Sequence, residues 1–212
     1  EQDIPALLRM GKEQVYILDS DLAEVHEDEA ALQIVQAICD ANVDWTEPSE
    51  GKSSVSAASD GLLRIDVNAL ERINLMGDIV VSSLQTDFPC RRGQVVASTR
   101  IVPLSIEQER LDLLHGIVNE HGPVISLLPF RRLRVGAVVT GSEVYSGMVE
   151  DGFADHVEPK ICAYGAALVE KIVVPDSANA IAEAIGRLRD KGCELILTTG
   201  GLSVDPDDVT RQ

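Results

Sequence analysis

The sequence predicts two domains: a β-rich α+β unit over residues 1–130, then an α/β unit with a parallel three-layer sheet over residues 131–212. In the first part, short strand-type runs are separated by turns. From residue 133 on, apolar strand-type runs alternate with helical patterns, which is typical of a parallel sheet with right-handed crossovers. The charge also changes, from 9 basic and 22 acidic residues (net −13) in residues 1–130 to 9 and 13 (net −4) in the rest.

The composition limits the classes of partner. The chain has 212 residues, of which 45% are hydrophobic, so it is long enough to bury a core of its own. A net charge of −17 argues against nucleic acid or an anionic membrane as the main partner. Four cysteines without metal-ligand spacing indicate free thiols in a reducing compartment. No apolar run reaches the length of a membrane span, so we expect a cytoplasmic protein.

The elements expected in residues 1–130 follow from local patterns. A helix over 27–38 has apolar residues at helical spacing and three acids in its first turn, where they suit the helix dipole. Another helix is predicted over 105–119, with Ser105 as its N-cap. Between them we expect an exposed strand at 53–58 and a loop at 87–92. The remaining expected elements are short helices at 3–10 and 67–76 and strands at 15–18, 61–67, 79–84, 93–104 and 124–128.

In residues 131–212 the expected order is strand 133–139, helix 156–168, strand 171–174, helix 177–191 and strand 195–197. Apolar residues on one face and Gly192 at the end mark the second helix. The last strand is expected to be central in the sheet. The residues expected to be buried are Val135, Val138, Ile172, Ile196 and Leu197.

Three polar loops follow the strands of this second unit, at 140–151, 175–176 and 198–210. In a parallel sheet such loops lie at one edge and can converge on a ligand. Glycines after a strand let the backbone pass close to a ligand, although Gly200-Gly201 is also compatible with a simple tight turn. Asp176 and Asp208 are likewise compatible with helix N-caps.

Four segments together resemble the molybdopterin-binding domain shared by molybdopterin adenylyltransferases and molybdopterin molybdotransferases. They are Val139-Thr140-Gly141-Ser142-Glu143, Ser146-Gly147-Met148-Val149-Glu150-Asp151, Val174-Pro175-Asp176, and Thr198-Thr199-Gly200-Gly201-Leu202-Ser203-Val204 with Asp208 and Thr210. The Thr-Gly-Ser-Glu and Leu-Ser-Val pieces are closer to the molybdotransferase branch. The Ser-Gly-Met-Val-Glu-Asp piece is closer to the adenylyltransferase branch. The family domain continues past the Asp208 loop, so the resemblance implies a fragment with an incomplete sheet.

The resemblance implies a role for each of these residues. Asp176 and Asp208 match acids used in catalysis, and Asp208 would also position a Mg²⁺ ion. Asp151 matches the acid of a loop that normally reads Asp-Ser-Asn, where this chain has Gly152 and Phe153 instead. The pterin and its phosphate would be held by Thr140, Gly141, Glu143, Gly147, Asp151, Thr199, Gly200, Gly201, Ser203 and Thr210.

The function implied is molybdopterin binding in molybdenum cofactor biosynthesis, with Mg²⁺ supporting molybdate insertion or adenylyl transfer. The partners would be the pterin and a nucleotide or molybdate, and we expect a homo-oligomer. Two alternatives remain open. One is a non-catalytic carrier or sensor, motivated by the altered Asp-Ser-Asn loop. The other is a nucleotide pyrophosphatase of the competence/damage-inducible family, which shares this domain.

Overall fold

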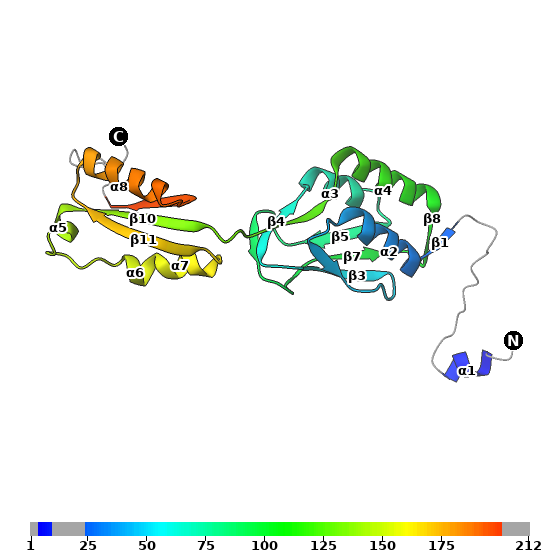
Figure 1. Ribbon diagram of the computed structural model, residues 1–212. Helices are drawn as coiled ribbons and strands as arrows, with labels where there is room; N and C mark the ends of the chain where they lie inside the picture. The colour runs from blue at the N-terminus through cyan, green and yellow to red at the C-terminus, as the bar shows by residue number, and fades with distance from the viewer. Residues whose placement is uncertain (1–3, 10–23, 201–212) are drawn as a thin grey trace. The chain divides into compact units, whose positions relative to one another are not determined.

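The computed structural model describes residues 4–9 and 24–200, and the chain divides into two compact units, residues 1–128 and 129–212 (Figure 1). The predicted strand at 15–18 lies outside the described residues. A short helix, α1 (Ile4–Arg9), is present where one was expected. Each unit has its own hydrophobic clusters.

Helix α2 (Glu27–Ile38) is central to the core of the first unit, and its bounds are those predicted. Its apolar face is at most 1% exposed and consists of Ala30, Ala31, Ile34, Val35 and Ile38. Three acids occupy its first turn, and the Asp28 carboxylate accepts a hydrogen bond from the Gly51 backbone N–H at 2.9 Å. The helical periodicity therefore selects the buried face correctly.

Two larger sheets, a two-stranded sheet of β1 and β8 described below, and two further helices complete this core. The four-stranded sheet has the order β2-β3-β7-β5, with bounds Val43–Trp45, Lys52–Ala57, Val95–Ile101 and Ile79–Ser83. A three-stranded sheet has the order β6-β4-β9, with bounds Phe88–Cys90, Gly61–Ile65 and Ile125–Pro129. Helices α3 (Val67–Asn74) and α4 (Gln108–His121) pack against each other.

Three local predictions in this unit are wrong. Strand β3 is not exposed, because Ser53, Val55 and Ala57 face the core, where the Ser53 hydroxyl donates to the Thr46 carbonyl at 2.7 Å. The expected loop at 87–92 contains strand β6, in which Pro89 is tolerated because β6 is at the edge of its sheet. Ser105 does not cap a helix. It begins strand β8 (Ser105–Glu107), which pairs with β1 (Glu24–His26).

The second unit contains a parallel three-stranded sheet of order β11-β10-β12, and the predicted parallel pairing is confirmed. Its strands are Ala167–Val174, Arg134–Thr140 and Leu195–Thr199. The prediction that the last strand is central is wrong for the described residues, because β10 lies between the other two. Accordingly Val135 and Val138 on β10 are buried, whereas Ile172, Ile196 and Leu197 are half-buried.

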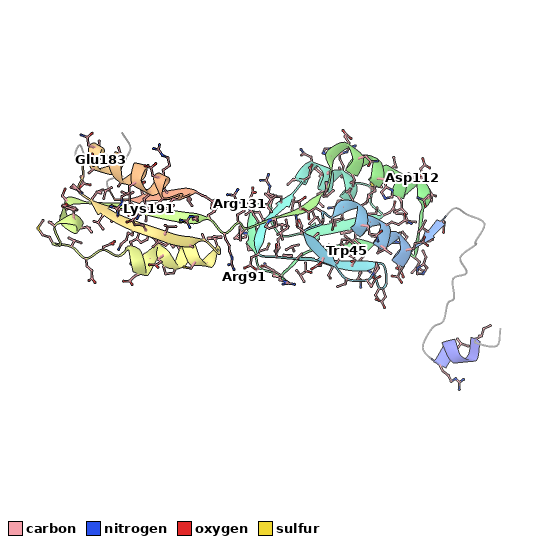
Figure 2. The ribbon with its side chains drawn as sticks, viewed as in Figure 1. Trp45, Arg91, Asp112, Arg131, Glu183 and Lys191 are labelled. Atoms are coloured by element: carbon pink, nitrogen blue, oxygen red, sulfur yellow. The ribbon has the colours of Figure 1, made fainter. Side chains whose placement is uncertain are left out.

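Helices lie on both faces of this sheet (Figure 1). Helix α8 (Ala178–Asp190) covers one face, with Val138, Ile181, Ala184 and Leu188 in a single cluster. Its outer face carries Glu183, which points away from the sheet (Figure 2). The other face is covered by α6 (Phe153–His156) and α7 (Glu158–Ala163), in a cluster with Val135, Ala137, Val139, Phe153 and Ile161.

The helix expected at 156–168 is two short helices, and its last residues belong to strand β11. Pro159 stands at the beginning of α7, where its missing N–H is tolerated. Gly165, at φ +72°, follows the end of that helix, and β11 starts two residues later. Ala167 is drawn into the strand because it pairs with Arg134 of β10.

In the described part of the chain, none of the helices combines the length and the apolarity needed to cross a bilayer.

Candidate functional site

The carboxyl ends of the three parallel strands of the second unit meet at one edge. In the register, Thr140 at the end of β10 pairs with Val174 at the end of β11, and Val139 pairs with Thr199 at the end of β12. The three predicted polar loops therefore all begin at this edge. Hydrogen bonds join the end of β10 to the end of β12, and the loop after β10 to the loop after β11.

The loops after β10 and β12 touch through Thr140. Its side chain is 3% exposed, and its hydroxyl donates to the Thr199 carbonyl at 3.3 Å. Gly200 follows at φ +87°, and a Cβ built on it would lie 2.1 Å from the Thr140 carbonyl oxygen. Only glycine fits here, because any side chain at position 200 would collide with the Thr140 backbone. Gly200 therefore lets the two backbone segments pass close to each other.

The loops after β10 and β11 are joined by Asp176. Its carboxylate accepts two hydrogen bonds from Ser142, from the backbone N–H at 2.8 Å and from the hydroxyl at 3.2 Å. Gly141, at φ +146°, adds a hydrogen bond from its N–H to the Val174 carbonyl at 3.3 Å. Asp176 thus caps the start of the short helix α5 (Ser142–Tyr145), rather than the helix that follows it in sequence.

The body of the loop after β10 is exposed and is folded on itself. The Glu143 carbonyl accepts hydrogen bonds from the N–H groups of Met148 at 2.8 Å and Val149 at 3.2 Å. Gly147, at φ +77°, lies in the turn between Glu143 and Met148. The apolar side chains of Tyr145, Met148 and Val149 are 61%, 74% and 54% exposed. A compact turn therefore presents an apolar tip beside the strand ends.

The far end of this loop is fixed by Asp151. One of its carboxylate oxygens accepts from the Phe153 N–H at 2.9 Å, and the other pairs with the Lys171 ammonium on β11. The Lys171 hydrogen bond is the main reason why the pKa of the Asp151 carboxyl lies below its ordinary value; the Phe153 N–H lowers it further and burial opposes both. The Asp151 carboxylate is therefore ionised at neutral pH, and each of its two oxygens has a partner.

Four predicted site residues, Gly201, Ser203, Asp208 and Thr210, lie outside the described residues. Over residues 4–9 and 24–200, no three His, Cys, Asp or Glu side chains are grouped so that they could hold a metal ion. At this edge the Asp176 carboxylate already accepts two hydrogen bonds from Ser142. The described residues alone do not make a Mg²⁺ site, and no step is assigned to that ion.

A comparison of the sequence with protein families decides what kind of domain this is. Residues 136–212 match the family described as "Probable molybdopterin binding domain". The second unit carries a domain of the molybdopterin-binding family. The match confirms the resemblance to this family, and the matched residues begin in β10, the central strand of the described sheet.

Curated relatives match part of this chain. A CinA-like protein of Amoebophilus asiaticus is 31% identical over 80 residues, which is 38% of this chain and 19% of the relative. A CinA-like protein of Citrifermentans bemidjiense is 35% identical over 80 residues and is covered to the same extent. The chain thus spans about a fifth of the length of these relatives.

Solved structures are also similar to this chain in part. One is the molybdopterin biosynthesis enzyme MoaB of Thermus thermophilus, 25% identical, with a TM-score of 0.35, covering 36% of this chain and 48% of that one. Another is the protein CinA of Thermoplasma acidophilum, 25% identical, with a TM-score of 0.34, covering 38% and 47%.

Two residues of this edge were not singled out from the sequence. Ser142 was part of a motif but had no assigned role, and Lys171 was only one residue of a strand. Their partners are 34 and 20 residues away in sequence. A lysine in an otherwise apolar strand could have been flagged as needing an acidic partner, but no spacing rule connects it to Asp151.

Proposed function

We propose that this chain binds molybdopterin at the carboxyl edge of the parallel sheet and serves molybdenum cofactor synthesis, with molybdate insertion as its reaction. The observation that supports this most is that the parallel strands β10, β11 and β12 end at one edge, within a segment that matches the molybdopterin-binding family. Ligands of open parallel sheets bind at this edge.

The groups at this edge can act by positioning a bound ligand. Glycine turns at Gly141 and Gly200 bring backbone close to the space beyond the strand ends. The hydroxyl groups of Thr140 and Ser142 and the Thr199 carbonyl lie on the same edge. Such an arrangement orients a pterin and its phosphate for a transfer step, which is how enzymes of this kind lower the barrier.

The direct test is a binding titration with molybdopterin, measured anaerobically by co-elution with the full chain and quantified by pterin fluorescence after oxidation. The informative variant is Asp176→Ala, which removes the carboxylate oxygen that accepts both hydrogen bonds from Ser142 and so releases the start of the loop. If the binding-competent loop then falls to about a tenth of its population, the Kd rises about tenfold.

The matched control is Glu183→Ala, an exposed acid on the outer face of α8. It changes the net charge equally and should leave the Kd unaltered. Binding that is absent from the wild type, or equal in both variants, would contradict the proposed site.

A second candidate is nucleotide pyrophosphatase activity, which is favoured by the matches to proteins named CinA-like. It is distinguished by incubating the chain with nucleotides and a divalent cation and measuring nucleotide hydrolysis. Hydrolysis without any binding of molybdopterin would favour this candidate. Tight molybdopterin binding without product from molybdate or nucleotide would instead favour a carrier.

A further inference from the structure

We propose that Lys171 is a positioning residue of the ligand site: it fixes the end of the loop 141–152 through Asp151, so that the loop stands preformed beside the strand ends. This inference rests on the proposed function for the identity of the ligand. The ordering of the loop is a separate claim, which can be measured without any ligand.

The loop 141–152 is held at both ends by side chains from one strand and its extension. At its beginning, Asp176, two residues beyond β11, accepts the N–H and the hydroxyl of Ser142. At its end, Lys171 within β11 pairs with Asp151. The neighbouring strand therefore sets where the loop leaves β10 and where it enters α6.

The surroundings of Lys171 suit a fixed rather than a mobile ion pair. The side chains of Lys171 and Asp151 are 32% and 18% exposed, so water screens the pair only in part. The ammonium also lies 5.8 Å from the ring centroid of Phe153, within the range of a cation–π contact. Phe153 itself is 3% exposed in the cluster beneath the sheet, so the pair is anchored to the core.

Between the two fixed ends, the loop contacts the core through Val144, and the residues that follow it are exposed. Residues 145–150 are all exposed, and three of their side chains are apolar: Tyr145, Met148 and Val149. A loop that is closed at both ends loses less conformational freedom when it binds a ligand than a loop that is free at one end. Lys171 therefore acts on ligand affinity through Asp151 and does not itself touch the ligand.

The test compares Lys171→Met, Lys171→Arg and the control Lys160→Met, an exposed lysine of α7. Methionine keeps an unbranched apolar stem near Phe153 but removes the charge, whereas arginine keeps the charge and can pair with the carboxylate. Amide hydrogen exchange of residues 146–153 should accelerate roughly tenfold in Lys171→Met, since local opening becomes easier. It should return toward the wild-type rate in Lys171→Arg and be unchanged in Lys160→Met.

The molybdopterin Kd is then measured for the same variants and for Asp151→Asn, alone and combined with Lys171→Met. The Kd should rise about tenfold in Lys171→Met, in proportion to the lost population of the ordered loop. Because Lys171 acts through Asp151, the double variant should bind no more weakly than Asp151→Asn alone.

Unchanged exchange in Lys171→Met, or faster exchange with an unchanged Kd, would overturn the inference. Additive losses in the double variant would also overturn it, because Lys171 would then act independently of Asp151. A wild type that does not bind molybdopterin would refute the proposed function instead. The exchange rates would still decide whether Lys171 orders the loop.

Discussion

At the scale of single residues, Gly200 is the position where the backbone tolerates least change. Its φ of +87° and the 2.1 Å approach of a built Cβ to the Thr140 carbonyl oxygen both exclude a side chain. Gly200→Ala should therefore destabilise the second unit by roughly 1–3 kcal/mol, the usual range for a strained backbone position. The measurement is thermal or urea unfolding followed by a probe in residues 129–212.

The matched control for Gly200 is Gly186→Ala, in the interior of α8. A Cβ at Gly186 meets no atom within 4 Å. Alanine in a helix is about 0.5–1 kcal/mol more stable than glycine, so this variant should be stabilised. Equal effects of the two substitutions would contradict the close crossing at Gly200.

Asp151 predicts how the loop responds to acid. Its pKa is lower in the folded chain than in the unfolded one, chiefly because of Lys171, so its stabilising contribution is fully present above the unfolded pKa of about 3.9. That contribution is lost as the pH falls through the lower, folded value. The difference in unfolding free energy between wild type and Asp151→Asn should be constant from about pH 5 to 7 and shrink below about pH 4. A difference that instead grows in acid would contradict the ion pair.

At the scale of elements, the packing of α8 on β10 depends on Leu188. Its side chain is fully buried, and it fills the space left by Gly136, where a Cβ would lie 2.9 Å from the Leu188 Cδ1. Leu188→Ala should cost about 2–5 kcal/mol by leaving a cavity. Chemical denaturation of the second unit measures this, and a loss below about 1 kcal/mol would mean that the helix is only loosely packed.

How far the elements could be predicted depends on the range of their interactions. Helix α2 was found residue for residue because its spacing and its acidic first turn are local signals. Strand β8 was missed because it exists only through pairing with β1, about 80 residues earlier. For the site, the shared edge at which the three strands end followed from the predicted parallel order. The Asp176–Ser142 and Lys171–Asp151 pairs did not, because they join separate loops and strands.

At the scale of the whole molecule, the two units have separate cores. Among the described residues, the largest cluster lies wholly within residues 30–127, and the other two lie within the second unit. We therefore expect two unfolding transitions in calorimetry. Leu111→Ala, at a fully buried position of α4, should lower only one of them, and Leu188→Ala should lower only the other. A single transition shifted by both variants would show that the units unfold together.

The central claim is that the second unit binds molybdopterin at the carboxyl edge of its sheet. The most direct measurement is amide hydrogen exchange of the full chain with and without saturating molybdopterin. The account predicts slower exchange on binding in residues 140–152, 175–177 and 198–200, with no change in residues 24–128. Protection confined to the first unit, or no protection in any of the three loops, would contradict it.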